Sequence, residues 1–109
     1  MTIPRQPLKV RYTIKADADL SSIWSYLTEN GSESRAYEFN SRIHRRIQQA
    51  ALFPFSGAPR PHLAQHMRVL FYQKYAIYYL PGAEEIIVVR VLHGARDIAA
   101  IAEEGGFVI

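Results

Sequence analysis

The fold is limited most tightly by residues 86–92, an almost unbroken aliphatic run with the sequence Ile-Ile-Val-Val-Arg-Val-Leu. A strand with one face in water alternates apolar and polar residues, whereas a strand with both faces covered is apolar along its length. The run therefore predicts a strand that is covered on both faces or flanked by other strands. Its one charged residue, Arg90, needs a charged or carbonyl partner there, because an unpaired buried charge is costly.

Two further strands are expected just before this run. Residues 67–72 and 75–80 are rich in residue types that favour strands, and only Gln-Lys at 73–74 separates them. Residues 81–84, Pro-Gly-Ala-Glu, form the next link. Both links are short enough to make hairpins, so the three strands are predicted to pair as an antiparallel unit.

The first half of the chain predicts one strand and then two helices. Residues 9–14 alternate apolar and polar side chains, which is typical of a strand with one buried face. Residues 17–29 and 32–52 instead repeat apolar side chains at helical spacing. The repeated positions are Leu20, Ile23, Trp24 and Leu27, then Ala36, Phe39, Ile43, Ile47 and Ala50.

Capping residues set the expected helix ends. Asp17 or Asp19 is expected to cap the first helix, and Asn30-Gly31 to end it. The second helix follows almost at once, so the two must form an antiparallel hairpin. Asp97 is expected to cap a short C-terminal helix that a pair of glycines ends.

These elements give the order β-α-α-β-β-β with a short C-terminal helix. We expect an α+β fold in which the helix hairpin packs on one face of a mostly antiparallel sheet. A length of 109 residues is typical of one compact domain, so residues 1–109 are predicted to form a single domain.

Composition excludes several classes of protein. The chain has no cysteine, which rules out disulfide scaffolds, thiol nucleophiles and zinc–thiolate sites. The first ten residues lack the apolar core of a secretory signal, and no apolar run approaches the ~20 residues that span a bilayer. We therefore expect a cytoplasmic protein. The formal net charge of +3 fits an acidic partner better than direct binding of nucleic acid, which stays open.

The order of elements and several motifs resemble the RelE/ParE toxin superfamily of type II toxin–antitoxin systems, over nearly the whole chain. The motifs are ADLSSIWSYL at 18–27, Phe53-Pro54 with Gly57 and Pro59, YAIYY at 75–79, and VRVLHGARD at 89–97. The last motif, an apolar strand running into RVLHGARD, is the most specific. It resembles the ParE branch, often called plasmid stabilisation proteins, more than the RelE branch.

The resemblance implies a bacterial toxin with a cognate antitoxin, of the ribbon-helix-helix type, that forms a hetero-oligomer with it. Toxins of the ParE type act on DNA gyrase, and those of the RelE type cut messenger RNA on the ribosome. We expect a ParE-like toxin that inhibits gyrase by binding. An inactive relative that only binds its antitoxin is a third hypothesis, which expression without the antitoxin would separate by the absence of growth arrest.

The alternative of an mRNA endoribonuclease rests on four side chains. Metal-independent cleavage needs a base for the 2′-hydroxyl proton, an acid for the leaving oxygen and cations for the phosphate. The groups available are Arg68, Arg90, His93 and Arg96. RelE-type sites usually add a Tyr or His near the C-terminus, and this chain has neither beyond His93. A purely structural interpretation is also open, in which His93 bonds the backbone and Arg96 pairs with an acid.

Other residues are candidates for contacts with a partner protein. Arginines on the second helix make either a basic patch or an ordinary solvated face. Tyrosines in the 67–80 hairpin make either core packing or an exposed aromatic strip. The partner-binding candidates are Arg42, Arg45, Arg46, Tyr72, Tyr75, Tyr78, Arg90 and Arg96.

No metal or cofactor is expected. His62 and His66 have the i, i+4 spacing of two metal ligands on a helix. Pro61 and the absence of nearby acids argue against a metal site, so both histidines are expected to lie on a loop or the surface.

Overall fold

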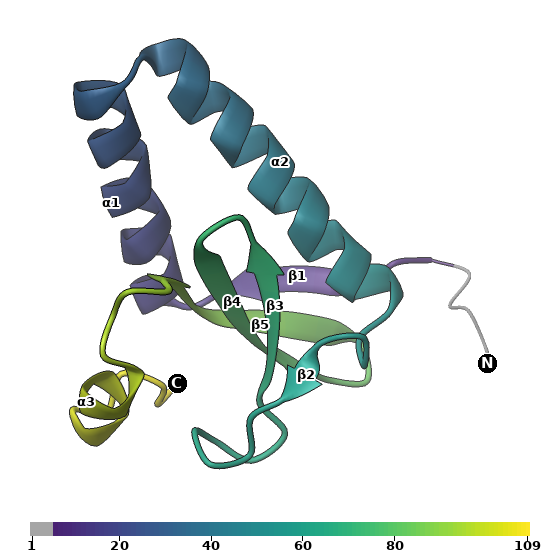
Figure 1. The fold of residues 1–109 in the computed structure, drawn as a ribbon. Helices are drawn as coiled ribbons and strands as arrows, with labels where there is room; N and C mark the ends of the chain where they lie inside the picture. The colour runs from purple at the N-terminus through teal and green to yellow at the C-terminus, as the bar shows by residue number, and fades with distance from the viewer. Residues whose placement is uncertain (1–5) are drawn as a thin grey trace.

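The order of elements predicted from the sequence is confirmed in a computed structural model, which describes residues 6–109 (Figure 1). The elements are β1 (Lys9–Tyr12), α1 (Ile14–Asn30), α2 (Glu33–Leu52), β2 (Ala58–Pro59), β3 (Arg68–Tyr72), β4 (Tyr75–Pro81), β5 (Glu85–His93) and α3 (Ile98–Glu103). The first five residues of the stretch that argued against a secretory signal lie outside the described residues. Among the helices of residues 6–109, none is long and apolar enough to cross a membrane.

The five strands form one sheet in the order β1-β5-β4-β3-β2. β5 lies between β1, to which it is parallel, and β4, to which it is antiparallel. The prediction that the aliphatic run is an inner strand is thus confirmed, as is the mostly antiparallel sheet. β2 was not predicted, because Ala58-Pro59 is too short to show a pattern and pairs with β3 only at the edge of the sheet.

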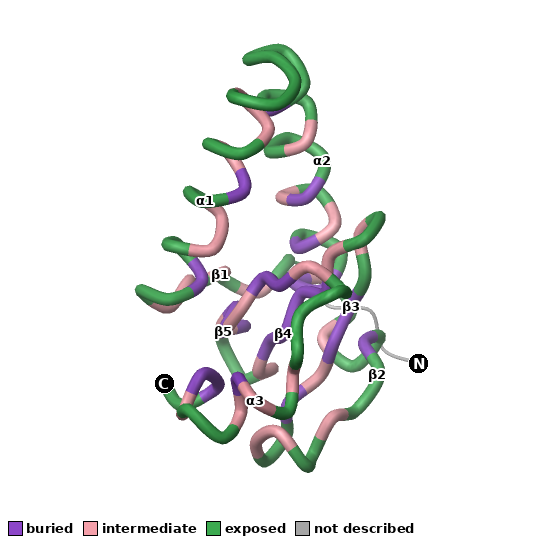
Figure 2. The backbone as a smooth tube through the Cα atoms, turned by 60° about the vertical axis from the view of Figure 1, so that its left-hand side comes forward, coloured by how far each residue is buried: buried purple, intermediate pink, exposed green. Residues whose placement is uncertain are grey.

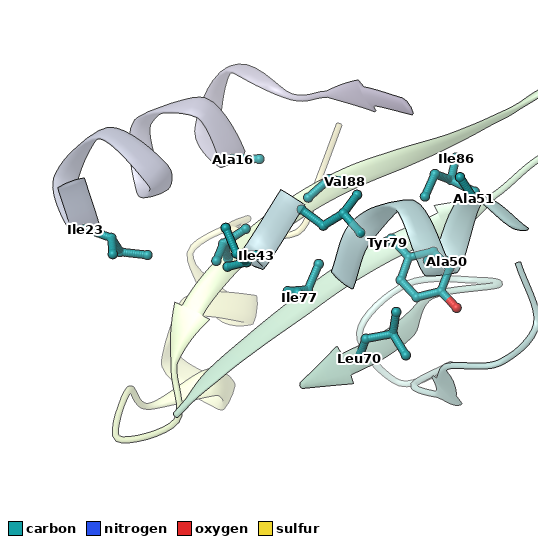
Figure 3. Packing of buried hydrophobic residues seen from close by; sticks show 12 residues of the cluster. Ala16, Ile23, Ile43, Ala50, Ala51, Leu70, Ile77, Tyr79, Ile86 and Val88 are labelled. Atoms are coloured by element: carbon teal, nitrogen blue, oxygen red, sulfur yellow. The ribbon is translucent and has the colours of Figure 1, made fainter. Parts of the chain in front are cut away.

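The helix hairpin covers one face of the sheet, and a core fills the space between them (Figures 1 and 3). The helical stripes predicted from spacing supply the helix side of this core, and Ile43 and Ile47 are fully buried in it. Tyr79 lies among these aliphatic side chains, and its hydroxyl donates to the Pro54 carbonyl at 2.8 Å. At the far end of the hairpin, away from the sheet, the backbone is mostly exposed or partly buried (Figure 2).

A second, smaller core lies on the opposite face of the sheet. Ile101 of α3 and Phe107 of the C-terminal tail cover it there. The ring of Phe107 packs edge-on against Tyr78 at 4.9 Å between centroids, and Tyr78 is only 6% exposed. Of the two alternatives for the tyrosines, core packing therefore holds for Tyr78, and an exposed strip does not include it, because the C-terminal segment closes over this face of the β3–β4 hairpin.

The junction between β1 and α1 also differs from its prediction. The strand ends at Tyr12 and the helix begins at Ile14, which is 89% exposed. Thr13 caps the helix, because its hydroxyl accepts a hydrogen bond from the amide of Ala16 at 3.0 Å. Neither Asp17 nor Asp19 is the cap, which leaves Asp19 free for another role.

A β-bulge interrupts the pairing of β4 with β5. Tyr78 lies opposite Arg90 while Tyr79 lies opposite Val88, so Val89 has no partner of its own on β4. A bulge kinks the strand and re-aims the side chains beyond it. The alternation of β5 changes at this point, and Val91 packs in the same core as Val88. Arg90 lies at this irregularity, and its side chain is largely but not fully buried.

A contact between Tyr12 and His44 joins β1 to α2. The Tyr12 hydroxyl lies 2.7 Å from Nδ1 of His44, and the two rings meet edge to face. Burial lowers the pKa of His44 from its ordinary value of 6.5. Burial, with a smaller contribution from the charge of Asp17, raises the pKa of Tyr12 from 10.0 to about 12. Both shifts favour the neutral form in the folded state.

We predict that the burial of His44 makes the protein less stable in acid. A folded-state pKa below 6.5 means that the contribution of His44 is present above pH 6.5 and is lost as pH falls below it. Urea unfolding midpoints should therefore fall between about pH 7.5 and about pH 5.5, and His44→Gln should reduce that fall. His62→Gln, at an exposed histidine, is the matched control. An unchanged pH dependence in His44→Gln would contradict the prediction.

Candidate functional site

Arg90 is held by Asp19 of α1. The Nε and NH2 groups of Arg90 donate to the two carboxylate oxygens at 2.7 and 2.8 Å, and both side chains are 12% exposed. The NH1 group donates to the carbonyl of Gly106 at 3.1 Å. The hydrogen bond to Asp19 raises the pKa of Arg90 above its ordinary value, so the guanidinium stays charged. The partner that the sequence required for Arg90 is thus a carboxylate of the first helix.

Asp19 also completes the edge of the sheet. β1 pairs with β5 only as far as Val88, so the later part of β5 has a strand on its β4 side but none on its β1 side. The Thr13 hydroxyl donates to the Val89 carbonyl at 2.8 Å, and the Val91 amide donates to Asp19 Oδ2 at 3.0 Å. Side chains at the start of α1 therefore satisfy the backbone groups that a longer β1 would have paired.

Arg68 has a structural role on the other face of the sheet. It pairs with Tyr79, whereas Arg90 pairs with Tyr78. Paired residues share a face and successive residues of a strand alternate, so the two arginines project from opposite faces. Arg68 NH1 donates to the carbonyls of Phe55 and Gly57 at 2.9 and 2.7 Å. The four proposed nuclease residues therefore do not form one cluster.

His93 and Arg96 do come together, in an open cleft of about 820 Å³. The cleft lies between α1, the β3–β4 turn and the end of β5. Its lining residues are Asp19, Ser22, Ile23, Tyr26, Gln73, Lys74, Tyr75, Val91, His93 and Arg96. The sequence analysis had named three side chains of this set as functional, His93, Arg96 and Tyr75, but not Tyr26 or Lys74.

The backbone around His93 fixes its ring. The Ala95 amide donates to His93 Nδ1 at 3.0 Å, so Nε2 of the neutral ring carries the proton and can donate. The ring also packs edge-on against Tyr75, with centroids 5.3 Å apart. The backbone contact expected in the structural interpretation is therefore present, and Nε2 keeps its own hydrogen-bonding capacity.

The arginines of α2 do not act as one free basic patch. Arg42 pairs with Glu38 at 2.7 Å in an exposed contact, and Arg46 Nε donates to the Phe71 carbonyl at 3.1 Å. Arg45 is exposed on the outer surface of α2. The alternative of a largely solvated face accounts for Arg42 and Arg45, whereas Arg46 ties the helix to β3.

The remaining candidates divide between core and surface. Tyr72 and Tyr75 are partly buried against Phe39 of α2. His62 and His66 lie exposed in the segment between β2 and β3. Within residues 6–109, no three side chains of the metal-binding types gather to hold an ion.

Asp19 is the important residue that sequence reasoning missed. Leu20 follows it directly and Ile23 lies four residues further along the helix, so Asp19 stands beside the apolar stripe, where it was interpreted only as a possible cap. The signal that pointed to it was indirect, because a charged residue in the aliphatic run required a partner of opposite charge. Which of the chain's acids supplied that partner depended on the tertiary fold.

Comparison with known proteins identifies related folds and a matching family. The family described as "ParE toxin of type II toxin-antitoxin system, parDE" matches residues 10–98. The search of curated proteins returned no match.

Two solved structures are similar. One is the chromosomal ParDE toxin–antitoxin system from P. aeruginosa, with 20% identity, 79% of this chain and 95% of that chain covered, and a TM-score of 0.68. The other is the RelBE2 toxin–antitoxin complex from Mycobacterium tuberculosis, with 18% identity, 87% and 100% coverage, and a TM-score of 0.50. At these identities the likeness establishes a shared fold.

We predict that Asp19→Asn destabilises the protein much more than Asp17→Asn does. The first change leaves Arg90 largely buried without a carboxylate, which costs about 3 kcal/mol of unfolding free energy. Asp17 is exposed on the same helix, and its loss should cost less than about 1 kcal/mol. Chemical denaturation of both variants measures the difference in unfolding free energy. Equal effects would show that the Asp19–Arg90 ion pair does not stabilise the fold.

Proposed function

This chain belongs to the ParE toxin family of type II toxin–antitoxin systems, and we propose that it is a toxin that acts by binding DNA gyrase. The family match covers residues 10–98, and we take residues 1–109 as one toxin domain. DNA gyrase is the target that the resemblance to the ParE branch implies. The proposed mode of action is inhibition by a protein–protein contact, without chemistry on a nucleic acid.

The engagement of Arg90 supports binding over cleavage. A nuclease without a metal needs cations whose N–H groups are free to meet a phosphate in the transition state. All three nitrogens of the Arg90 guanidinium donate within the protein, to Asp19 and to Gly106. Arg68 is bound to loop carbonyls on the opposite face. Two of the four groups that the cleavage hypothesis requires are therefore committed to the fold.

We further propose that a cognate antitoxin neutralises this toxin in the cytoplasm. The two similar structures are both toxin–antitoxin complexes. A ribbon-helix-helix antitoxin with a charged flexible segment is the partner that the family resemblance implies, and the toxin would form a hetero-oligomer with it. The net charge of +3 favours an acidic segment in that role.

A ribosome-dependent endoribonuclease is the second candidate, because His93 and Arg96 share the cleft. In this alternative His93 would exchange a proton with the reacting hydroxyl, and Arg96 would face the phosphate. Of the four predicted groups, such a site would use only His93 and Arg96. Lys74, which also lines the cleft, would be a further cation.

We predict that the purified toxin inhibits supercoiling of relaxed plasmid by gyrase at stoichiometric concentration. Inhibition by binding should saturate as the toxin approaches the gyrase concentration, and heat-unfolded toxin serves as the control. Messenger RNA in a translating extract should stay intact with the same folded protein.

The opposite pair of results identifies the alternative. Full supercoiling activity, together with site-specific mRNA cuts that His93→Ala abolishes, would replace the gyrase proposal by the endoribonuclease.

A further inference from the structure

The cleft combines buried aliphatic side chains with an exposed aromatic ring. Ile23 and Val91 line it but belong to the core on the helix side of the sheet, and they are only 9% and 2% exposed. Tyr26 stands beside them and is 60% exposed. An exposed aromatic side chain next to an apolar hollow is typical of the central part of a protein interface, where such rings contribute most of the binding energy.

The rim of the cleft carries a surplus of positive charge. Asp19 is the one acid among the described residues that line it, and its carboxylate is neutralised by Arg90. Lys74 and Arg96 are exposed, and within residues 6–109 the side chains of Lys74 and Arg96 form no hydrogen bond or ion pair. Their charges are therefore available to a ligand. Nε2 of His93, which also lines the cleft, adds a hydrogen-bond donor.

The sheet fixes the wall of the cleft that Lys74, Tyr75 and His93 form. Tyr75 packs between Phe39 and His93, with ring centroids 5.1 and 5.3 Å away. The Gly94 amide donates to the Lys74 carbonyl at 2.7 Å, which ties the β3–β4 turn to the end of β5. A wall fixed in this way loses little conformational freedom on binding, so the cleft is preorganised for a ligand.

We propose that the cleft docks an acidic segment of the target protein, with an apolar side chain against Tyr26 and carboxylates at Lys74 and Arg96. The inference rests on the proposed function, in which the toxin acts by binding gyrase. Charge complementarity selects the occupant, because the uncompensated groups of the rim are cations around an apolar lining. A nucleic-acid strand would need a longer track of cations. The arginines of α2 do not supply one, because Arg42 pairs with Glu38 and Arg46 donates to the Phe71 carbonyl.

Charge reversal at the rim and truncation of the aromatic ring test the proposal. The variants are Lys74→Glu/Arg96→Glu and Tyr26→Ala, all at exposed positions. Matched controls are Arg45→Glu and Tyr37→Ala, at exposed positions of α2 that do not line the cleft. Thermal unfolding of each variant verifies that the fold is retained. The measurements are the affinity for immobilised gyrase and the concentration that halves supercoiling.

We expect the rim variant to weaken gyrase binding by about tenfold or more, because it sets like charges against an acidic segment. Tyr26→Ala should weaken binding as well, and both controls should bind as the unmodified toxin does. Retained binding in both cleft variants, with inhibition by the unmodified toxin, would overturn the cleft assignment and leave the gyrase proposal standing. Absence of inhibition by the unmodified toxin would overturn both.

A separate arm of the experiment tests whether the cleft binds a nucleic acid. The toxin is titrated against a single-stranded DNA oligonucleotide of about ten nucleotides, a length in the range that such sites contact. No binding is expected. Binding that Lys74→Glu/Arg96→Glu abolishes would overturn the assignment of the cleft to a protein segment.

Discussion

The contact between Asp19 and Arg90 joins the three parts of the molecule that meet at the end of β5. Asp19 belongs to the first helix, Arg90 to the inner strand β5, and Arg90 also reaches the carbonyl of Gly106 in the C-terminal tail. The contact is needed because β1 is too short to cover β5 beyond Val88. A carboxylate that accepts from both a guanidinium and a backbone amide replaces the missing strand.

The same contact decides which chemistry the surface can offer. It commits Arg90 to the fold, and Arg68 projects from the opposite face of the sheet. What stays available near the end of β5 is a cleft with an aromatic wall and a cationic rim. A surface of that composition suits recognition of a protein segment, which is the role that we propose for the cleft.

Sequence periodicity was sufficient for the architecture, because each helix and long strand buries one regular stripe or run. Ile43 and Ile47 are buried as their spacing predicts, and the aliphatic run of β5 is an inner strand. The boundary at Thr13 was missed, and the sequence did not decide between core and surface for Tyr78, since a cap and a tail that closes over a sheet are not periodic features. The role of Asp19 was missed because residues 71 positions apart meet only in the folded chain.

A double-mutant cycle on Asp19 and Arg90 tests the central claim most directly. Asp19→Asn, Arg90→Gln and the double variant are unfolded with denaturant, and the coupling free energy is taken from the four stabilities. The account predicts a coupling of more than about 1 kcal/mol, so that the double variant is far less destabilised than the sum of the single changes. A coupling near zero would mean that Arg90 does not depend on Asp19 and is free to serve another function.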